Sequence, residues 1–331
     1  MSKVLVTGGA GFVGSRLCRR LLDAGHEVFV LDAFTQYLAP PIDPLYVYNV
    51  NYRFDQLLRG AEILRGTTLN KDELRRRILD LKPDRIVHFA ALPLANMALE
   101  FSEEALLSIV GGTANLLEIL RDLRQIDRFV YISSSMVYGD FAKVPMPEDG
   151  FEKEPKEIYG GMKLAGEHIV KVYSRRYDIP YSIVRPSAVY GPTDNNRRVV
   201  GVFLHAALAG TKIRVKNGAQ TFLDFSFVED TAQGIERVTL SDAAAGETFN
   251  ITRGRGRSLT ELVALIQERY PNAEVEHYEA DTFRPNRGAL DVSKAKKLVG
   301  YDPQFDIEEG VAAYADFLEE AYDKLGLRRA Q

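Results

Sequence analysis

Short apolar runs alternate with longer amphipathic stretches along the first part of the chain. Residues 3–7, KVLVT, form an apolar run that meets a glycine cluster, which predicts a buried strand. Apolar residues then recur at helical spacing from Val13 to Leu22, and Gly25 marks a stop, which predicts a helix. The same patterns predict strands at 27–32, 61–66, 84–91, 128–135 and 181–191, and helices at 71–82, within 102–123 and at 159–177.

Strands that alternate with helices indicate a parallel sheet with helices on both faces. The alternation weakens from Pro192 onward, where 194–210 and 258–270 are expected to form helices of a smaller lobe. We therefore predict an α/β fold, a Rossmann-type doubly wound parallel sheet with a smaller C-terminal α/β lobe. The larger domain is expected to comprise 1–185 and about 225–250, and the smaller lobe about 186–224 and 251–331.

Composition and charge narrow the class of protein. The 331 residues are 46% hydrophobic and 27% charged, which is ordinary for a soluble globular protein. The net charge of −4 argues against nucleic acid as the main partner. No apolar run approaches the roughly 18 residues of a membrane helix, and the N-terminus runs straight into a strand, so neither a membrane partner nor a signal peptide is expected. Cys18 is the single cysteine, which favours a reducing, cytoplasmic location.

A glycine loop joins the first predicted strand to the first helix. Gly8, Gly11 and Gly14 have the spacing G-x-x-G-x-x-G, and Asp32 ends the second strand. Glycines let a pyrophosphate approach the amide N–H groups of a helix N-terminus, and a carboxylate at the end of the second strand binds the ribose hydroxyls. A helix-packing turn beside an ordinary exposed aspartate is the alternative. Because Ala33 and the residue after it are not basic, the pattern favours NAD over NADP.

A tyrosine and a lysine lie four residues apart in the helix predicted at 159–177. Tyr159 and Lys163 would be neighbours on one helical face, where the ammonium lowers the pKa of the phenol. That makes tyrosine a usable base near neutral pH. An amphipathic tyrosine beside a lysine that extends toward solvent would give the same pattern. The hydroxyls of 133–135 follow a strand, at the sheet edge where α/β folds place their sites.

Taken together, these motifs resemble the extended short-chain dehydrogenase/reductase superfamily, in its NAD-dependent nucleotide-sugar epimerase/dehydratase branch. The matching stretches are TGGAGFVGS (7–15), Asp32, HFAAL (88–92), SSMVYG (134–139), Tyr159-x-x-x-Lys163, VRPSAVYGP (184–192), FVEDTAQGI (227–235) and RPNRGALDVSKA (284–295). The resemblance implies a catalytic triad of Ser134, Tyr159 and Lys163, with a nucleotide-diphosphate sugar as substrate in the smaller lobe. It also implies a homodimer formed through the two long helices.

The resemblance also assigns further residues to ligands. It implies cofactor contacts from Gly8, Gly11, Phe12, Val13, Gly14, Asp32, Ala90, Ala91, Leu92, Tyr159 and Lys163. It implies substrate contacts from Ser135, Met136, Arg198 and Arg284. The two glycines between Tyr159 and Lys163 are interpreted as leaving room for the cofactor.

The residues before VYG bear on the reaction. The 4,6-dehydratases of the branch have Thr-Asp-Glu there, and glucuronate decarboxylases tend to have a glutamate, whereas this chain has Ser134, Ser135 and Met136. Without those carboxylates, elimination and decarboxylation are disfavoured, which leaves a C4 epimerase that passes through a 4-keto sugar and retains NADH. The alternatives are a 4-keto-sugar reductase, an epimerase at another carbon, or a non-catalytic NAD-binding protein.

Several positions depart from the family pattern. Ala188 stands where family members usually have asparagine, and Leu223 where they have arginine, both contacts of the substrate phosphates. The diphosphate is therefore expected to be bound by other groups. The stretch 33–51 is rich in proline and tyrosine and is expected to be a long excursion. It either shapes or covers the sugar pocket or, as we favour, its tyrosines, Tyr37, Tyr46 and Tyr48, pack on the rest of the protein. The five scattered histidines show no metal-ligand spacing, so no metal is predicted.

Overall fold

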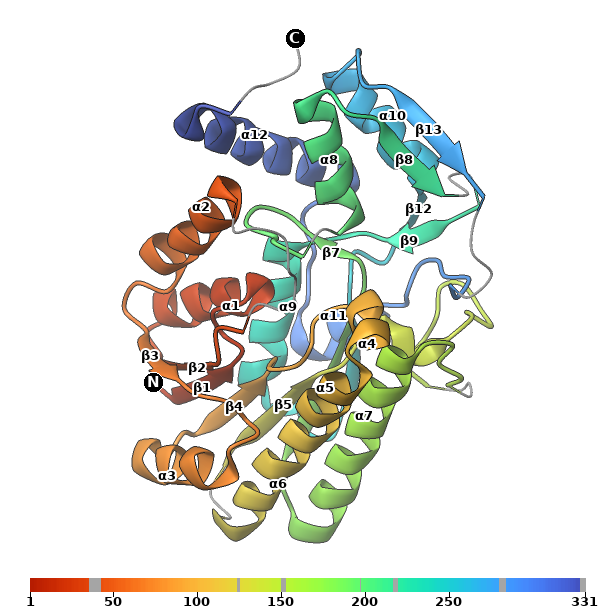
Figure 1. Cartoon of the computed structure of the whole chain (residues 1–331). Coiled ribbons are helices and arrows are strands. Elements are labelled where there is room, and N and C mark those ends of the chain that lie inside the picture. Colours follow the sequence, from red (N-terminus) through yellow and green to blue (C-terminus); the bar gives the residue numbers. More distant parts are fainter. Residues whose placement is uncertain are drawn as a thin grey trace.

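The computed structural model describes residues 1–35, 43–123, 126–149, 153–196, 198–216, 220–279 and 284–327. A seven-stranded, fully parallel sheet forms the body, in the order β11-β6-β5-β4-β1-β2-β3 (Figure 1). Its strands are β1 (Lys3–Thr7), β2 (Glu27–Asp32), β3 (Glu62–Arg65), β4 (Arg85–His88), β5 (Arg128–Ile132), β6 (Tyr181–Pro186) and β11 (Thr248–Ile251). The order reverses beside β1, as in a doubly wound sheet, so the predicted fold is confirmed.

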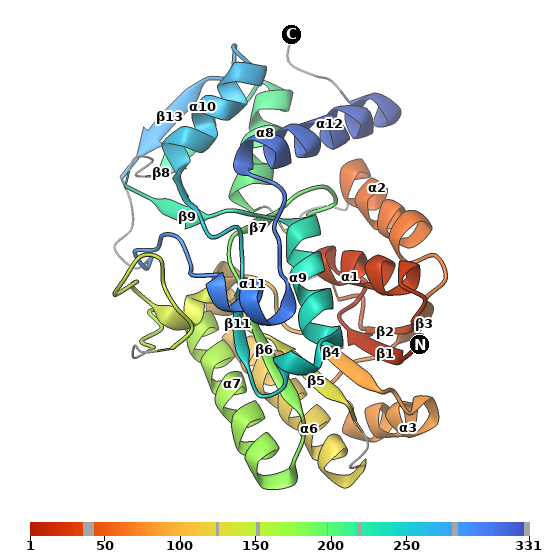
Figure 2. The same cartoon turned by 180° about the vertical axis from the view of Figure 1, so that it is seen from behind.

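Both faces of the sheet are covered by helices. Because side chains alternate across a strand, Val4 and Val6 enter one apolar cluster while Leu5 enters another. Helices α1, α9 and α11 pack on the first face, and α3, α6 and α7 on the second (Figures 1 and 2). Their bounds are α1 (Phe12–Asp23), α3 (Lys71–Leu81), α6 (Gly112–Leu123), α7 (Ile158–Tyr177), α9 (Val228–Leu240) and α11 (Ser293–Val299).

The helix predicted within 102–123 is present but is not uniform. It consists of α5 (Ser102–Leu106), a π-helical turn η2 (Leu107–Gly111) and α6, and α4 (Ala95–Glu100) precedes it. A second π-helical turn, η1 (Arg53–Leu57), follows α2 (Pro44–Tyr52). A 3₁₀ turn, η3 (Ser135–Tyr138), follows β5, and another, η4 (Asp242–Ala244), precedes β11. Single π turns inside helices are frequent at functional sites.

A smaller lobe lies above the carboxyl edge of the main sheet in Figure 1. It holds the helices α8 (Val199–Ala209), α10 (Leu259–Arg269) and α12 (Ile307–Leu325), and the short strands β7 (Val189–Tyr190), β8 (Ile213–Lys216), β9 (Phe222–Asp224), β10 (Ser226–Phe227), β12 (Gly256–Ser258) and β13 (Val275–Tyr278). Its buried residues form a cluster of their own. By contrast, Ala295 and Val299 of α11 pack into the core of the body. We therefore propose that the body also takes in α11, which the sequence division placed in the smaller lobe.

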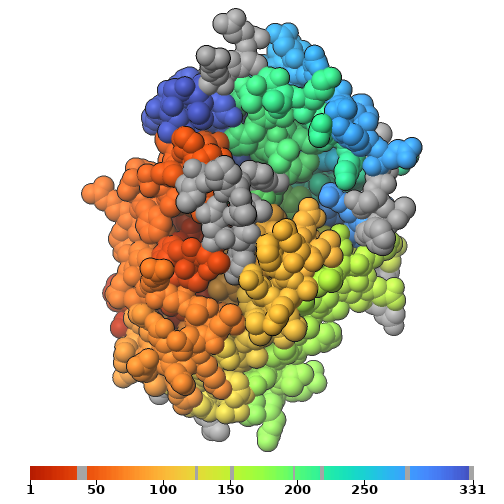
Figure 3. Space-filling view, in the orientation of Figure 1, coloured from red at the N-terminus to blue at the C-terminus, as the bar shows by residue number. Residues whose placement is uncertain are grey.

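The excursion after β2 contains a helix that the sequence pattern did not predict. Asp43 caps α2 by accepting a hydrogen bond from the backbone N–H of Tyr46, and Pro44 occupies the first helical position. The ring of Tyr48 packs against Phe317 of α12, so the predicted packing of this tyrosine is confirmed. Tyr37 lies outside the described residues. Figure 3 shows α2, in orange, meeting α12, in dark blue, on one face of the molecule.

Candidate active site

A cavity of about 780 Å³ opens at the carboxyl ends of β1, β2 and β4. Ligands bind at this edge in open α/β sheets. The predicted cofactor residues that line it are Gly8, Gly11, Phe12, Val13, Gly14, Asp32, Ala90 and Ala91. Leu92, whose side chain is fully buried, does not line it, and neither do Tyr159 and Lys163. Both π-helical turns, η1 and η2, contribute to the wall.

The glycine loop is packed too tightly for larger residues. Gly8 has a φ of +72°, and a Cβ there would lie 2.8 Å from the backbone nitrogen of Ala90. A Cβ on Gly14 would lie 2.7 Å from the carbonyl oxygen of Gly8. The loop therefore closes on itself and on the end of β4, while the N-terminus of α1 faces the cavity. Unpaired amide N–H groups at that terminus favour an anion.

Asp32 ends β2 at the wall of the cavity. Its Oδ2 accepts a hydrogen bond from the backbone N–H of Ala10 (3.1 Å), and its Oδ1 accepts one from Phe34 (2.9 Å). Burial raises the pKa of this carboxyl, and the two backbone hydrogen bonds oppose the shift. The carboxylate is thus fixed to the glycine loop, with capacity left to accept hydrogen bonds from the hydroxyls of a ribose.

The structure brings the three predicted catalytic residues together. Tyr159 and Lys163 lie one turn apart on α7, and Ser134 follows β5 at the start of η3. The Ser134 hydroxyl lies beside the Tyr159 side chain, whose pKa it lowers, and accepts a hydrogen bond from the backbone N–H of Met136 (3.2 Å). The Lys163 ammonium donates to the carbonyl oxygen of Ile132 (2.8 Å) and lies 5.9 Å from the centroid of the Tyr159 ring.

The electrostatics of the triad differ from the prediction. Burial raises the pKa of Tyr159 to about 12, and the charge of Arg198 and the Ser134 side chain oppose that rise. Burial lowers the pKa of Lys163 to about 7, and the Glu167 carboxylate opposes that fall. The pKa of Tyr159 is therefore raised rather than lowered in this arrangement, and the role of Lys163 stays a prediction. The nearby charge that favours the phenolate belongs to Arg198.

Comparison with known proteins decides the family. The model of the NAD dependent epimerase/dehydratase family matches residues 4–252. The chain belongs to this family. The chain is 28% identical to a dTDP-glucose 4,6-dehydratase of Xanthomonas campestris pv. campestris, over 96% of this chain and 93% of the relative. It is 30% identical to a UDP-glucose 4-epimerase of Mycolicibacterium smegmatis, over 95% of this chain and 98% of the relative.

A solved structure adds the fold-level comparison. The UDP-glucuronic acid 4-epimerase from Bacillus cereus, in complex with UDP-glucuronic acid and NAD, matches with a TM-score of 0.86 and 26% identity. The match covers 97% of this chain and all of that one. The predicted family and the predicted cofactor, NAD, are confirmed. The closed glycine loop and the partly buried Asp32 fit that dinucleotide. The roles of individual residues and the homodimer stay predictions.

A close contact between two backbone segments explains why a glycine follows Tyr159. A Cβ on Gly160 would lie 2.5 Å from the carbonyl oxygen of Met136, in the turn that carries Ser134. Gly161 has no atom within 4 Å of the corresponding position. Gly160 therefore lets α7 approach the η3 turn, and the interpretation that the two glycines leave room for the cofactor stays a prediction. The same turn buries Ser135, which is 1% exposed.

A buried polar network, which sequence analysis missed, lies beneath the triad. Glu167, one turn beyond Lys163, accepts hydrogen bonds from Nε (2.8 Å) and Nη2 (2.5 Å) of Arg185 and from Ser133 Oγ (2.6 Å). Both side chains of this ion pair are 1% exposed. Nη1 of Arg185 also donates to Tyr138 Oη (2.8 Å). The signal for Glu167 was its spacing, because Tyr159, Lys163 and Glu167 recur every four residues.

The predicted substrate arginines lie in different places. Arg198 lines the cavity beside the phosphate loop, 5.4 Å from the Phe12 ring centroid, and forms an ion pair with Asp194 (2.6 Å). Arg284 is exposed and does not line the cavity. Arg287, three residues on, is near Glu157 at the start of α7, and burial lowers the pKa of its guanidinium to about 10. The carboxylate of Glu157 opposes that shift.

The two departures from the family pattern have distinct structural contexts. Ala188 has a φ of +37°, in the left-handed region that asparagine tolerates better than alanine. Leu223 packs in the core of the smaller lobe. It pairs across β9 and β12 with Arg257, whose guanidinium forms ion pairs with Glu261 and Glu308. Neither position supplies a group for a phosphate.

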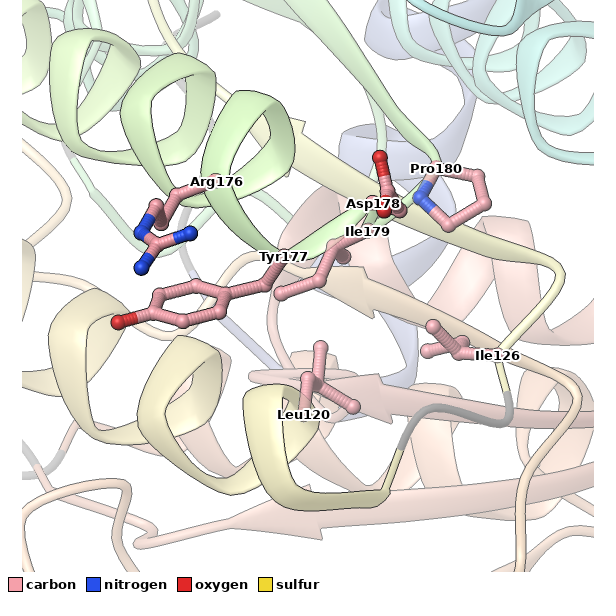
Figure 4. A pocket seen from close by; sticks show the side chains of 7 residues that line it. All are labelled: Leu120, Ile126, Arg176, Tyr177, Asp178, Ile179 and Pro180. Carbon is pink, nitrogen blue, oxygen red and sulfur yellow. The ribbon is translucent and has the colours of Figure 1, made fainter.

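A second, smaller hollow of about 310 Å³ lies at the other end of α6 and α7 (Figure 4). Its wall consists of Leu120, Ile126, Arg176, Tyr177, Asp178, Ile179 and Pro180. None of the predicted site residues contributes to it, so the larger cavity is the candidate site. Within the described residues, no cluster of three or more histidine, cysteine, aspartate or glutamate side chains could hold a metal ion, and no helix is both long and apolar enough to cross a membrane.

His88 and Cys18 are both core residues. The imidazole of His88 lies within hydrogen-bond distance of the hydroxyls of Thr7 (2.7 Å) and Thr113 (3.1 Å), so both of its ring nitrogens have partners. Burial lowers the pKa of His88 to about 3, which keeps the ring neutral. Cys18 is fully buried in the core of the body, and burial raises the pKa of its thiol.

Proposed function

We propose that this protein is an NAD-dependent nucleotide-sugar epimerase that inverts C4 through a transient 4-keto sugar. Membership of the family supplies the reaction class and the cofactor. The cluster of Ser134, Tyr159 and Lys163 supports catalysis over a purely binding role, because a binding protein has no need of a hydroxyl, a phenol and an ammonium in this arrangement.

The choice of epimerase over dehydratase rests on the residues of the η3 turn. After Ser134 the turn continues with Ser135 and Met136 and offers no carboxylate. Elimination of water from the sugar needs an acid and a base there. The buried carboxylate on α7, Glu167, is engaged by Arg185 and Ser133. The turn therefore lacks the groups for elimination, whereas inversion at C4 needs only the triad.

Each triad residue has a role that its position supports. Tyr159 Oη removes the proton of the sugar C4 hydroxyl. It returns the proton after the 4-keto sugar has rotated and presents its opposite face. Ser134 holds that hydroxyl by a hydrogen bond, and its position beside Tyr159 lowers the pKa of the phenol, which favours the phenolate. The Lys163 ammonium, fixed by the carbonyl oxygen of Ile132, would hold the ribose next to the nicotinamide. NAD, when bound, would supply the hydride acceptor for C4 and, in its reduced form, the hydride donor.

The substrate is proposed to be a UDP-linked hexose or uronate. This proposal draws on the UDP-sugar epimerases among the relatives and solved structures. Arg198 at the cavity and the Arg284–Arg287 segment near the start of α7 are proposed as cationic contacts of an anionic sugar nucleotide.

An NMR time course tests the function directly. The purified protein is incubated with UDP-, GDP- and CDP-linked sugars, neutral and uronic, without added cofactor, and Tyr159→Phe is the control. We expect inversion at C4 of a UDP-sugar without net NADH, and none with the control. A 4-keto-6-deoxy product would overturn the choice of epimerase over dehydratase. Reduction of a supplied 4-keto sugar with consumption of NADH, and no inversion, would establish the reductase instead.

A further inference from the structure

Arg53 is a buried cation in the wall of the cofactor cavity. Its residue is 8% exposed. The guanidinium donates two hydrogen bonds, both to backbone carbonyl oxygens, from Nη1 to Ala10 (3.0 Å) and from Nε to Asn49 (3.4 Å). Within the described part of the chain, no carboxylate lies within ion-pair distance of it. The guanidinium therefore carries a charge and N–H groups that these contacts leave unmatched.

The neighbouring arginines around the glycine loop, unlike Arg53, have carboxylate partners. Arg16 forms an ion pair with Glu229 (2.7 Å), and Arg198 forms one with Asp194 (2.6 Å). Burial lowers the pKa of Arg53 and Tyr46 opposes that shift; the charge of Arg16 lowers the pKa further, and the carboxylates of Asp194 and Asp32 oppose it. An unpaired charge in such a position is unfavourable until an anion reaches it.

The position of Arg53 indicates which anion it meets. Its partner Ala10 lies in the β1–α1 loop, directly before Gly11 and the first turn of α1. The N–H of Ala10 is held by Asp32, the predicted ribose ligand. Arg53 thus lies where the ribose end of the site meets the phosphate-binding end. We propose that Arg53 binds the pyrophosphate of NAD, as a side-chain cation added to the backbone amides of the loop.

The segment that carries Arg53 is anchored on the smaller lobe. Nδ2 of the buried Asn49 donates to Oδ1 of Asn195 (2.7 Å), and Nδ2 of Asn195 donates to the carbonyl oxygen of Tyr46 (3.4 Å). The ring of Tyr52 packs edge-on against Phe317 of α12, with centroids 5.2 Å apart. A pyrophosphate bound at Arg53 therefore ties the α2–η1 segment, the glycine loop and the smaller lobe together. These connected contacts retain the cofactor between the two hydride transfers, a consequence that rests on the proposed function.

Binding measurements without any sugar test the proposal. The protein is stripped of nucleotide, and affinities for NAD, ADP-ribose, adenosine and NADP are measured by calorimetry for the wild type, Arg53→Met and Arg53→Gln. We expect the affinities for NAD and ADP-ribose to fall about 10- to 100-fold, as for the loss of a charged hydrogen-bond partner, and the affinity for adenosine to be unchanged. NAD released from the freshly purified variants should fall in parallel.

Arg128→Met is the matched control. Arg128 is 5% exposed and bonds to neutral oxygens, but it starts β5 at the opposite edge of the sheet from the cavity. Its loss should leave all four affinities unchanged. Glutamine keeps an N–H donor near the position of Arg53 Nε, which bonds to the carbonyl oxygen of Asn49, so Arg53→Gln decides the question if Arg53→Met does not fold.

Three results would overturn the assignment to the pyrophosphate. An unchanged affinity for ADP-ribose would show that Arg53 does not contact the phosphates. An equal loss for adenosine would show that Arg53 shapes the cavity as a whole. A loss confined to NADP would assign Arg53 to a 2′-phosphate. Because no sugar is present, none of these results depends on the epimerase activity.

Discussion

Glu167→Gln removes one charge from the ion pair beneath the triad and leaves the shape almost unchanged. Arg185 keeps its hydrogen bonds to Tyr138 Oη and to the carbonyl oxygen of Glu148, but its buried charge loses its partner. Removing one member of a buried ion pair destabilises proteins by about 3–5 kcal/mol. At about 2.1 cal/mol/K per residue, the 331 residues have an unfolding entropy of about 0.7 kcal/mol/K, so Tm should fall by about 4–7 °C.

Thermal unfolding followed by circular dichroism measures this effect, with Glu73→Gln as the control. Glu73 forms a half-exposed ion pair with Arg77 on α3, and such pairs contribute less than about 1 kcal/mol. A Glu167→Gln variant that loses no more stability than Glu73→Gln would refute the assignment of a strong buried pair. Replacing both Glu167 and Arg185 by methionine should recover much of the loss, because the unmatched charge is then removed as well.

The stability that the Glu167–Arg185 ion pair contributes depends on pH in a defined direction. Burial alone would raise the pKa of Glu167, but the hydrogen bonds and charge of Arg185 outweigh it, and the net pKa in the folded state is lowered. A carboxyl whose folded pKa is lowered contributes stability above its unfolded pKa and loses it as the pH falls through the folded value. The difference in stability between the wild type and Glu167→Gln should therefore be full at neutral pH and shrink in acid, below the ordinary range of glutamate.

Three further substitutions test the site. Tyr159→Phe should abolish turnover while NAD stays bound, since only the exchangeable proton is lost; a near-normal rate in the NMR assay would contradict the catalytic role. Asp32→Ala should weaken NAD binding by about 10- to 100-fold in calorimetry with little change in Tm, and an unchanged affinity would exclude the ribose contact. Gly160→Ala should destabilise the protein by about 1–3 kcal/mol and lower kcat, because the new Cβ would press on the carbonyl oxygen of Met136; wild-type values for both would show that α7 can shift freely.

The sequence predicted the body of the fold well because its signals are local. Strands such as 3–7 and 27–32 are continuous apolar runs bounded by glycine or charge, and the structure places β1 and β2 there. Helix α2 was missed because apolar and tyrosine side chains occur on all of its sides, so no amphipathic period marks it. The aspartate–proline pair at 43–44 was the available signal.

The residues of the candidate site were likewise predicted where their signal is local and missed where it depends on contacts between distant parts of the sequence. Tyr159 and Lys163 were found from spacing within one helix, and the structure places them beside Ser134. The pairing of Glu167 with Arg185 joins a helix to a strand 18 residues later, and no local pattern shows that their side chains meet. Arg53 was missed for the same reason, since its contact with the glycine loop spans 43 residues. The lowered pKa predicted for Tyr159 was wrong because burial dominates the effect of neighbouring charges.

The position of β11 at the edge of the main sheet has a consequence for synthesis on the ribosome. Strand β6 ends at Pro186 and its partner β11 ends at Ile251, so about 65 residues, part of the smaller lobe and helix α9, are made between them. At about 5–20 residues per second, the β6 edge waits unpaired for about 3–13 s. During this interval the nascent chain exposes an unpaired strand edge, which is a template for strand addition by other chains until β11 emerges.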